Sequence, residues 1–377
     1  MSARVVVKLS WQQALAWRMG RQLLDPIGSQ PVVEVVRRLG GIQSQVPSSA
    51  ELAIRVRQER SRSSDVSGAL AKGRLIKTWA MRGTLHLLTP EDGGAFLSIL
   101  AFGRSWERPA WERWIGMTPE HWRIFRAVVR EALASGPLAR DELAAAILAQ
   151  PRLSHLGEEL RSGWGTLYKP LAWQGDLCFG PGEGNRTTFA RPDLVSATWA
   201  GVPPADEAAP RVIVAYLGAY GPATIEHLHR WLARGRVSVR QLRTWFAACE
   251  ERLAEVEVDG ERAFVLAEHL DELAAAKPTL AVRLLPGFDQ WVLGPGTDDG
   301  HVTPPARRAT VSRQSGWISP VVVAGGVVSG TWALDGAVAR IGWFREAGKP
   351  PRDALEAELA SLSSILKRDL HAQITLA

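Results

Sequence analysis

Apolar residues in the first forty positions recur at helical spacing between short polar breaks. Ser10-x-x-Gln13 has the form of a capping box, and the apolar side chains after it share one helix face at Trp11, Leu15, Met19 and Leu23. Asp25-Pro26 breaks this helix, and a second helix over 32–39 ends at Gly40-Gly41. The pattern therefore predicts two short helices joined by a tight connection.

Two further helices and a pair of strands follow. Ser48-x-x-Glu51 has the form of a second capping box, and residues 65–72 predict another short helix. Residues 75–79 and 84–88 alternate or run apolar on either side of Met81-Arg82-Gly83, which predicts two strands and a tight turn. Helices followed by a β-hairpin are the order of elements in a winged helix.

The same order recurs twice more, without obvious sequence identity between the copies. Residues 120–190 contain three helical segments and then the hairpin sequence DLCFGPGEGNRTTFARP. After a Pro-rich linker at 201–210, residues 209–268 repeat the order and place Asp259-Gly260 at the tip of a hairpin. Three such copies in one chain predict tandem winged helices.

From about residue 276 the pattern changes to apolar runs typical of strands. LAVRLLPGFDQWVLG and SPVVVAGGVVSGTWAL are β-rich, Gly325-Gly326 predicts a hairpin, and the chain closes on a helix. We therefore expect an α+β fold with four parts: three winged helices, at 1–115, 116–200 and 201–275, and a β-rich domain with a terminal helix at 276–377.

Composition limits the class of protein. Apolar residues make up 46% of the 377 residues and charged residues 22%, the balance of a globular chain, and no apolar run is long enough to span a membrane. The N-terminus meets polar residues too early for a secretory signal, so a cytosolic protein is expected. Cys178 and Cys249 are too few for a disulfide framework or a zinc site.

The charge adds a positive indication. Lys and Arg together number 45 against 39 Asp and Glu, and all but seven of the 45 are Arg. The sequence pI is near 9.7, which is typical of nucleic-acid binders, and arginine forks suit phosphate groups. The alternative is that the arginines reflect the coding bias of GC-rich DNA. Charge by itself does not decide between nucleic-acid binding and coding bias.

Several motifs fail on geometry. The glycines of 180–184 resemble a phosphate loop but lie at a hairpin tip and open no helix. His227 and His229 are two apart on a predicted helix and point to different faces, whereas zinc ligands would be three or four apart. Asp298-Asp299 lies in a Gly/Pro-rich loop and is interpreted as solvated. Common hydrolase signatures are missing from the sequence, and neither a metal nor a cofactor is expected.

Gln43-Ser44-Gln45 is the strongest remaining motif. It lies between the glycines that end the second helix and Pro47, where an extended segment would project residues two apart to the same side. Both amides would then converge on one point. The alternative is that the two glutamines cap helices or face solvent.

The chain resembles the winged-helix DNA glycosylases of the AlkZ and YcaQ type. The resemblance is carried by LGGIQSQVPSSAELAIRVR and IKTWAMRGTLHLLTP, and further along by LLPGFDQWVLG and PVVVAGGVVSGTW, and it covers nearly the whole chain. It implies three winged helices around a concave DNA-binding face, with Gln43 and Gln45 as the catalytic pair of the AlkZ branch. Ser44 departs from the usual apolar middle position, whose side chain should face away from the site.

Neutral glutamines fit a restricted substrate. Guanine alkylated at N7 already carries a positive charge and leaves as a neutral base, so a pair of amides that holds a water in line with C1′ can suffice. We therefore expect a monofunctional glycosylase for N7-alkylguanine in double-stranded DNA. Its substrates would include bulky adducts and interstrand crosslinks made by a DNA-alkylating natural product, and the enzyme would serve self-resistance.

Further site residues are expected, of which Arg82 on phosphate and His86 near the lesion are implied by the resemblance. Five are assigned to a lesion pocket: Trp79, Arg82, Thr84, His86 and Asp289. Six arginines are chosen for DNA contact: Arg55, Arg57, Arg186, Arg240, Arg243 and Arg313. The alternatives are that Trp79 and His86 are strand residues packed under the wing, and that each arginine is a solvated surface charge.

A non-catalytic winged-helix regulator is the competing function. In that case SVRQLRTWF of the third copy would enter a DNA groove, but a regulator has no need of Q-x-Q beside W-x-x-R-G-T-L-H. Three modules in one chain make a monomer sufficient, so we expect a monomer on the nucleoid.

Overall fold

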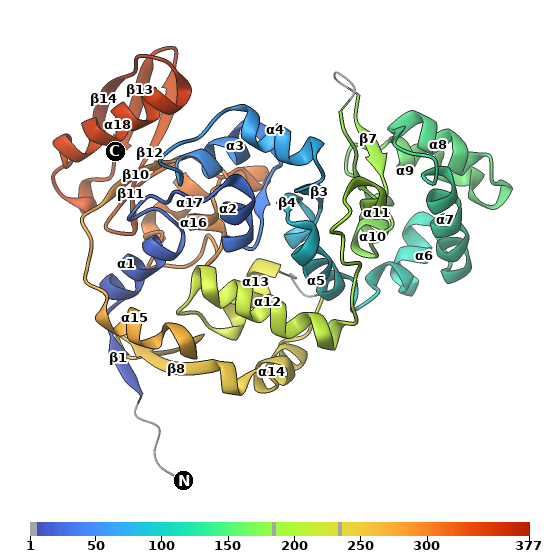
Figure 1. The fold of residues 1–377 in the computed structure, drawn as a ribbon, viewed down its shortest axis with the longest axis horizontal. Coiled ribbons are helices and arrows are strands. Elements are labelled where there is room, and N and C mark those ends of the chain that lie inside the picture. Colours follow the sequence, from blue (N-terminus) through green and yellow to red (C-terminus); the bar gives the residue numbers. More distant parts are fainter. Residues whose placement is uncertain (1–5, 183–185, 233–235) are drawn as a thin grey trace, which may run out of the picture. The chain divides into compact units, whose positions relative to one another are not determined.

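The structure is a computed structural model that describes residues 6–182, 186–232 and 236–377 (Figure 1). The chain forms two compact units. Unit 1 comprises Met1–Asp65, Ile213–Trp231 and Phe246–Ala377, and unit 2 comprises Val66–Val212 and Leu232–Trp245. Both units draw on segments distant in the sequence, so the predicted boundaries of the four sequence modules stay a prediction.

The first helices of unit 1 begin and end largely where the sequence predicts. α1 (Trp11–Arg21) starts at the predicted capping box, in which Ser10 Oγ accepts from the Gln13 N–H at 3.3 Å. α2 (Val32–Arg38) ends before Gly40 and Gly41, whose φ angles of 62° and 112° favour glycine. The turn that follows leads directly to the glutamine motif.

The predicted capping box at Ser48 is wrong. α3 (Pro47–Arg55) has Val46 as its N-cap and Pro47 as its first residue, so Ser48 lies inside the first turn. Proline favours this position because its fixed φ suits the helix and its missing N–H would have had no partner there. Glu51 instead pairs with Arg55 at 3.0 Å.

The third copy keeps the predicted order of elements but starts earlier. Its helices are α12 (Ala205–Tyr220), α13 (Ile225–Leu232) and α14 (Val239–Ala247), followed by the strands β8 (Leu253–Val258) and β9 (Glu261–Leu266). Asp259 and Gly260 form the hairpin tip with positive φ, as predicted. The predicted linker is wrong in part, because α12 begins at Ala205 and contains Pro210.

One strand of this region was not predicted. β1 (Val7–Leu9) pairs in parallel with β8, and the Asp259 carboxylate accepts from the Trp11 N–H at 2.8 Å. A three-residue strand carries almost no periodicity, so only its distant partner identifies it.

The C-terminal part of unit 1 is an antiparallel sheet with one parallel edge. The strand order is β10-β11-β12-β13-β14, with β10 (Val282–Leu285), β11 (Val321–Ala324), β12 (Val327–Asp335), β13 (Val338–Trp343) and β14 (His371–Leu376). Gly325 and Gly326 turn β11 into β12 as predicted, and α18 (Arg352–Leu366) is the predicted terminal helix. β14 was not predicted, and it pairs in parallel with β13.

Short helices fill the connections of this region. They are α15 (Leu270–Ala275), α16 (Gln290–Leu293) and α17 (Arg308–Val311). The sequence GFDQWVLG, predicted as β-rich, therefore forms the turn and helix around α16. Asp289 caps this helix by accepting a hydrogen bond from the Trp291 N–H. This N-cap favours a helix more strongly than the apolar run favours a strand.

Unit 2 joins the hairpins of the first two copies into one sheet. Its strands run β4-β3-β6-β7-β5, and Lys77 of β3 pairs with Phe179 of β6. They are β3 (Ile76–Trp79), β4 (Leu85–Leu88), β5 (Leu138–Ala139), β6 (Cys178–Phe179) and β7 (Thr188–Ala190). This shared sheet explains why the compact unit begins near residue 66 and not near the predicted boundary at 116.

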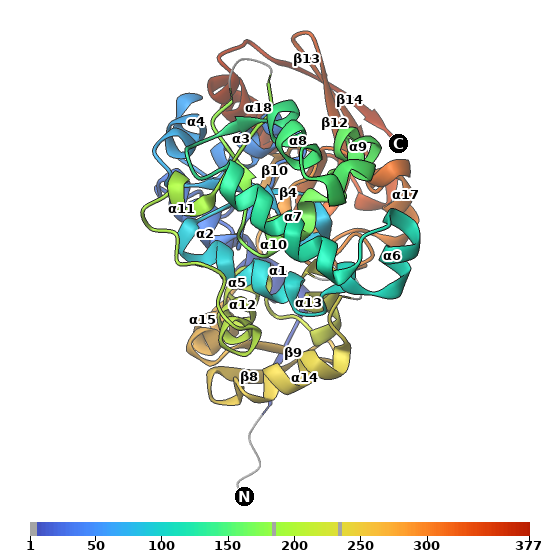
Figure 2. The same cartoon turned by 90° about the vertical axis from the view of Figure 1, so that its right-hand side faces the viewer.

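The helices of unit 2 between α4 and α11 include α7 and α8, which pack against each other (Figure 2). These helices of unit 2 are α4 (Ser64–Ala71), α5 (Pro90–Ala101), α6 (Pro109–Ile115), α7 (Pro119–Ala132), α8 (Arg140–Leu148), α9 (Gly157–Arg161), α10 (Tyr168–Trp173) and α11 (Pro192–Val195). The predicted glycine-rich tip falls partly on 183–185, outside the described residues. The mixed α+β class is confirmed.

Candidate active site

The glutamine motif connects α2 to α3 in unit 1. Ile42 and Gln43 form the short strand β2 (Ile42–Gln43), and Pro47 begins the next helix. Gln43 is only 6% exposed, whereas Gln45 is an exposed residue. The segment therefore leaves the interior between its two glutamines, with one amide group buried and the other accessible.

The middle residue, Ser44, is buried. Its exposed fraction is 2%, and its hydroxyl oxygen has no hydrogen-bond partner among the described residues. A buried hydroxyl without a partner gains nothing over an apolar side chain of similar size. Convergence of the two flanking amides on one point stays a prediction.

Asp289 has a structural role. Its two carboxylate oxygens accept from Arg57 Nη2 at 2.7 Å and Nη1 at 2.8 Å, and neither side chain is exposed. One of the same oxygens accepts from the Trp291 N–H at 2.8 Å. Both carboxylate oxygens thus have partners within the protein, and the expected place of Asp289 in a lesion pocket stays a prediction.

Arg57 and Arg55 brace α3 from inside the protein. Arg57 follows the helix, and besides Asp289 it donates to the Ala53 carbonyl at 2.6 Å. Arg55 is 7% exposed and donates to Glu51, Ser61 and the Ile365 carbonyl of α18. Because neither guanidinium lies at the surface, the prediction that these two arginines contact DNA is wrong.

Trp79 belongs to an aromatic cluster in unit 2. Its ring centroid lies 4.7 Å from that of Phe179 and 5.9 Å from that of Phe189, and it stacks on Tyr168 at 6.4 Å. A Cβ on Gly165 would meet the indole ring at 2.5 Å, so the backbone also packs closely against it. This placement fits the alternative, a strand residue packed in the core, and the assignment of Trp79 to a lesion pocket stays a prediction.

The turn between β3 and β4 presents Arg82 on a tight backbone. Arg82 has φ 58° and ψ 11° inside the 3₁₀ turn Met81–Gly83, and its side chain is half-buried. Thr84 closes the turn by donating from Oγ1 to the Met81 carbonyl at 3.1 Å. Arg82 is thus held in a fixed backbone conformation between the two strands, and its contact with a ligand stays a prediction.

His86 is buried and neutral. Its Nδ1 lies 3.1 Å from the Thr84 carbonyl, so Nδ1 carries the proton and donates to that oxygen. Burial first, and the positive charge of Arg82 second, lower the pKa of His86 to about 3. At neutral pH this imidazole has no extra proton to give to a leaving base, so it cannot act there as an imidazolium acid.

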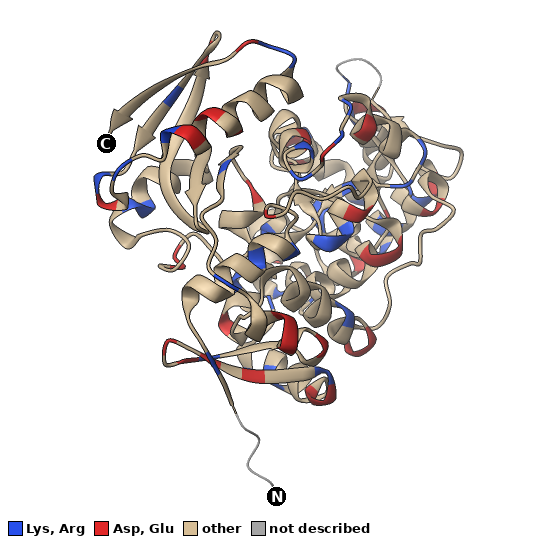
Figure 3. Ribbon diagram, turned by 60° about the vertical axis from the view of Figure 1, so that its left-hand side comes forward, with Lys and Arg blue, Asp and Glu red and all other residues tan. Residues whose placement is uncertain are grey.

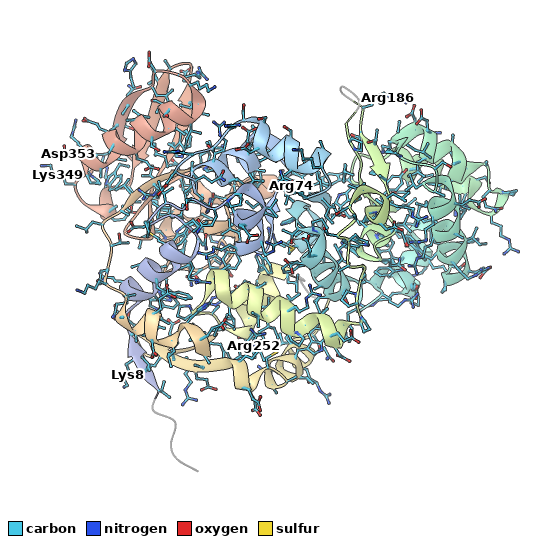
Figure 4. The ribbon with its side chains drawn as sticks, viewed as in Figure 1. Lys8, Arg74, Arg186, Arg252, Lys349 and Asp353 are labelled. Atoms are coloured by element: carbon cyan, nitrogen blue, oxygen red, sulfur yellow. The ribbon has the colours of Figure 1, made fainter. Side chains whose placement is uncertain are left out.

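The remaining four arginines chosen for DNA contact are exposed. Arg186 lies at the start of the arm that contains β7 (Figure 4) and pairs with Asp141 at 3.1 Å and Glu142 at 3.4 Å. Arg240 and Arg243 lie on α14, and Arg313 precedes a tight turn in unit 1. Figure 3 shows Lys and Arg interspersed with Asp and Glu over many elements of the described ranges.

Sequence reasoning missed the Arg57–Asp289 pair and the aromatic surface at Trp317. Trp317 is 46% exposed, its ring meets Phe288 edge-on at 5.1 Å, and its carbonyl accepts from the Arg313 N–H. The Arg57–Asp289 pair could have been predicted from the sequence, because a carboxylate inside an apolar run needs a buried cation. Nothing in the sequence pattern indicates that Trp317 is exposed.

The described ranges hold neither a candidate membrane span nor a candidate metal centre. None of the helices there is long and apolar enough to cross a membrane. No group of three or more His, Cys, Asp or Glu residues with metal-binding geometry occurs in them.

The comparisons with known proteins decide the family. The model of the family described as "DNA glycosylase AlkZ-like" matches residues 36–365. The chain belongs to the AlkZ-like DNA glycosylase family. It is a DNA glycosylase, and its substrate is therefore DNA.

Two matches to this AlkZ-like chain, one to a sequence and one to a solved structure, span nearly its full length. A Streptomyces sahachiroi protein named "Interstrand DNA cross-link repair glycosylase" is 47% identical over 358 residues, which cover 95% of this chain and 96% of the relative. The solved structure of the Streptomyces sahachiroi DNA glycosylase AlkZ matches with a TM-score of 0.94 and 46% identity. That match covers 98% of this chain and all of the solved chain, and it supports the α+β fold described above.

Proposed function

We propose that this glycosylase hydrolyses the N-glycosidic bond of N7-alkylguanine, including bulky adducts and interstrand crosslinks. The observation that carries the proposal is the Gln43-Ser44-Gln45 segment, with one buried and one exposed amide, in a chain 47% identical to a glycosylase named for cross-link repair. In an organism that makes a DNA-alkylating compound, unhooking such crosslinks would provide self-resistance.

The chemistry of the site supports a cationic substrate. Gln43 and Gln45 are uncharged, and the carboxylate of Asp289, a residue expected in the lesion pocket, is paired with Arg57. With His86 neutral as well, these residues offer neither a strong base nor an acid at neutral pH. They suit a substrate base that already carries a positive charge and therefore leaves as a neutral molecule without being protonated. For such a base, holding a water in line with C1′ is enough.

We propose that Gln45 contacts the attacking water and that Gln43 orients it. The burial of Gln43 restricts its rotamers, whereas the exposed Gln45 is open to substrate and solvent. Arg82 and Thr84 would then contact the DNA backbone next to the lesion. A guanine crosslinked to the opposite strand need not rotate out of the stack for this chemistry, in contrast to the usual base-flipping route.

The fold proposal is three winged helices around a concave DNA-binding face, followed by the β-rich domain. Supporting it, the second copy runs α7, β5, α8, α10, β6 and β7, with β5 paired to β7. The third copy has an equivalent bridge from Ala223 to Phe264. Exposed arginines would contact phosphate: Arg186, Arg240, Arg243 and Arg313.

The test is base release from a duplex with one N7-methylguanine under single-turnover conditions. Gln43→Ala and Gln45→Ala should each lower the rate at least tenfold, about 1.4 kcal/mol in the barrier, with DNA affinity near that of the wild type. Gln373→Ala, which removes an exposed glutamine from β14, is the matched control and should keep the wild-type rate. Full activity of the double variant would remove the catalytic assignment.

The same assay separates the glycosylase from a DNA-binding regulator. A regulator would release no base and would bind one sequence in preference to others. Family membership and the glutamine motif favour the enzyme.

A further inference from the structure

The link from α2 to the glutamine motif is short and rich in glycine. Only Leu39, Gly40, Gly41 and Ile42 lie between α2 and Gln43, and both glycines have positive φ. Two backbone hydrogen bonds close the turn, from Gly40 N to Arg37 O and from Gly41 N to Val36 O. Glycine supplies the conformation but little stiffness, so the position of Gln43 depends on what holds the ends of the turn.

Tyr220 holds one end. Its hydroxyl donates to the Leu39 carbonyl at 2.6 Å, and its side chain is fully buried. Leu39 is the C-cap of α2, where carbonyl groups lack partners within the helix. The phenol therefore fixes the last carbonyl before the two glycines.

Gln290 contacts the Tyr220 hydroxyl in turn, and the absence of a side chain at Gly294 leaves room for the tyrosine ring. Gln290 Oε1 lies 3.4 Å from the phenol oxygen, while its buried Nε2 has no partner among the described residues in this orientation. Turning the amide over points the NH₂ group at the phenol oxygen, which satisfies it and leaves the phenol proton for Leu39. A Cβ on Gly294 would lie 2.1 Å from the tyrosine ring, so the ring is packed tightly against the end of α16.

We propose that Tyr220 is a positioning residue for Gln43, an inference that rests on the proposed catalytic role of the glutamine motif. The phenol does not touch the reacting atoms. It fixes the backbone four residues before Gln43, and a catalytic group displaced by about 1 Å can lose on the order of a hundredfold in rate.

The chain offers a matched control one helical turn away. Tyr216 is also fully buried in α12, and its hydroxyl donates to the Gly294 carbonyl at 3.2 Å. Tyr216→Phe and Tyr220→Phe each remove one buried oxygen that donates to a carbonyl. A purely structural role would give both variants similar effects.

The experiment measures single-turnover base release from N7-methylguanine duplex, DNA affinity and thermal unfolding. Tyr220→Phe should lower the rate about tenfold, with affinity within twofold of the wild type, whereas Tyr216→Phe should keep the wild-type rate. The double variant with Gln43→Ala should be no slower than Gln43→Ala alone, because the phenol acts through that side chain.

The outcomes separate this inference from the proposed function. A slow Gln43→Ala together with a wild-type rate for Tyr220→Phe would overturn the positioning role and leave the catalytic assignment intact. So would equal losses in the two tyrosine variants, or a further tenfold loss in the double variant. A wild-type rate for Gln43→Ala would overturn the catalytic assignment, and the positioning role with it.

Discussion

Replacing Asp289 by Asn should destabilise the protein far more than it slows the chemistry of the folded enzyme. The substitution keeps the size of the side chain and its ability to cap α16, but it leaves the guanidinium of Arg57 buried without its counter-charge. Removal of one partner of a buried ion pair typically costs about 3–5 kcal/mol. The two hydrogen bonds of 2.7 and 2.8 Å and the zero exposure of both side chains place this pair in that class.

The expected signature is a fall in melting temperature. For domains of about 150–250 residues, 1 kcal/mol shifts the melting temperature by about 2–4 °C, so the loss should be on the order of 10 °C. Replacing both partners, as in Arg57→Met with Asp289→Leu, should recover much of it, because apolar side chains carry no desolvation cost. Differential scanning calorimetry measures both shifts.

An exposed pair provides the control. Arg307 and Glu346 form a similar two-point contact at 2.6 and 2.8 Å, but at the surface. Glu346→Gln should therefore leave the melting temperature close to that of the wild type. The reasoning would be refuted if Asp289→Asn melted like the wild type and yet lost base release, because Asp289 would then be a catalyst and not a brace.

Three further predictions concern the site. Gln45→Asp should retain release of N7-methylguanine, because a carboxylate can also hold the water, and the wild type should leave uracil and 8-oxoguanine in place; release of all three bases is quantified by chromatography. Because folding lowers the pKa of His86 to about 3, its stabilising contribution is present above the unfolded value near 6.5 and is lost as the pH falls from there towards 3. The difference in melting temperature between wild type and His86→Gln should therefore shrink as the pH is lowered from 8 to 4. A difference that does not change with pH would contradict the burial of a neutral imidazole. Arg240→Ala and Arg243→Ala should each weaken duplex binding regardless of sequence and reduce its salt dependence, measured by fluorescence anisotropy at several salt concentrations; an unchanged salt slope would exclude phosphate contact.

Local chemistry predicted much of the fold. The capping box at Ser10, the glycines after α2 and the Asp259-Gly260 hairpin depend on neighbouring residues, and the structure has them where the sequence places them. The parallel pairing of β1 with β8 and of β13 with β14 depends on partners far away in the chain. Periodicity within a short strand carries no such information.

The features of the site likewise divide into those that local sequence predicts and those that depend on distant residues. Spacing singled out Gln43 and Gln45, and the structure places them at a turn between two helices. Residue type alone could not separate an arginine that braces a helix, such as Arg57, from one at the surface, such as Arg240. The difference depends on a buried partner, Asp289, which lies more than two hundred residues later in the chain than Arg57.

Product analysis on a duplex with a defined N7-guanine interstrand crosslink tests the central claim most directly. The wild type should convert the crosslink into two separated strands, with an abasic site where the guanine was released, and Gln43→Ala with Gln45→Ala should leave the crosslink intact while still binding the duplex. An unchanged crosslink after prolonged incubation with active wild-type enzyme, or unhooking by the double variant at the wild-type rate, would contradict the account.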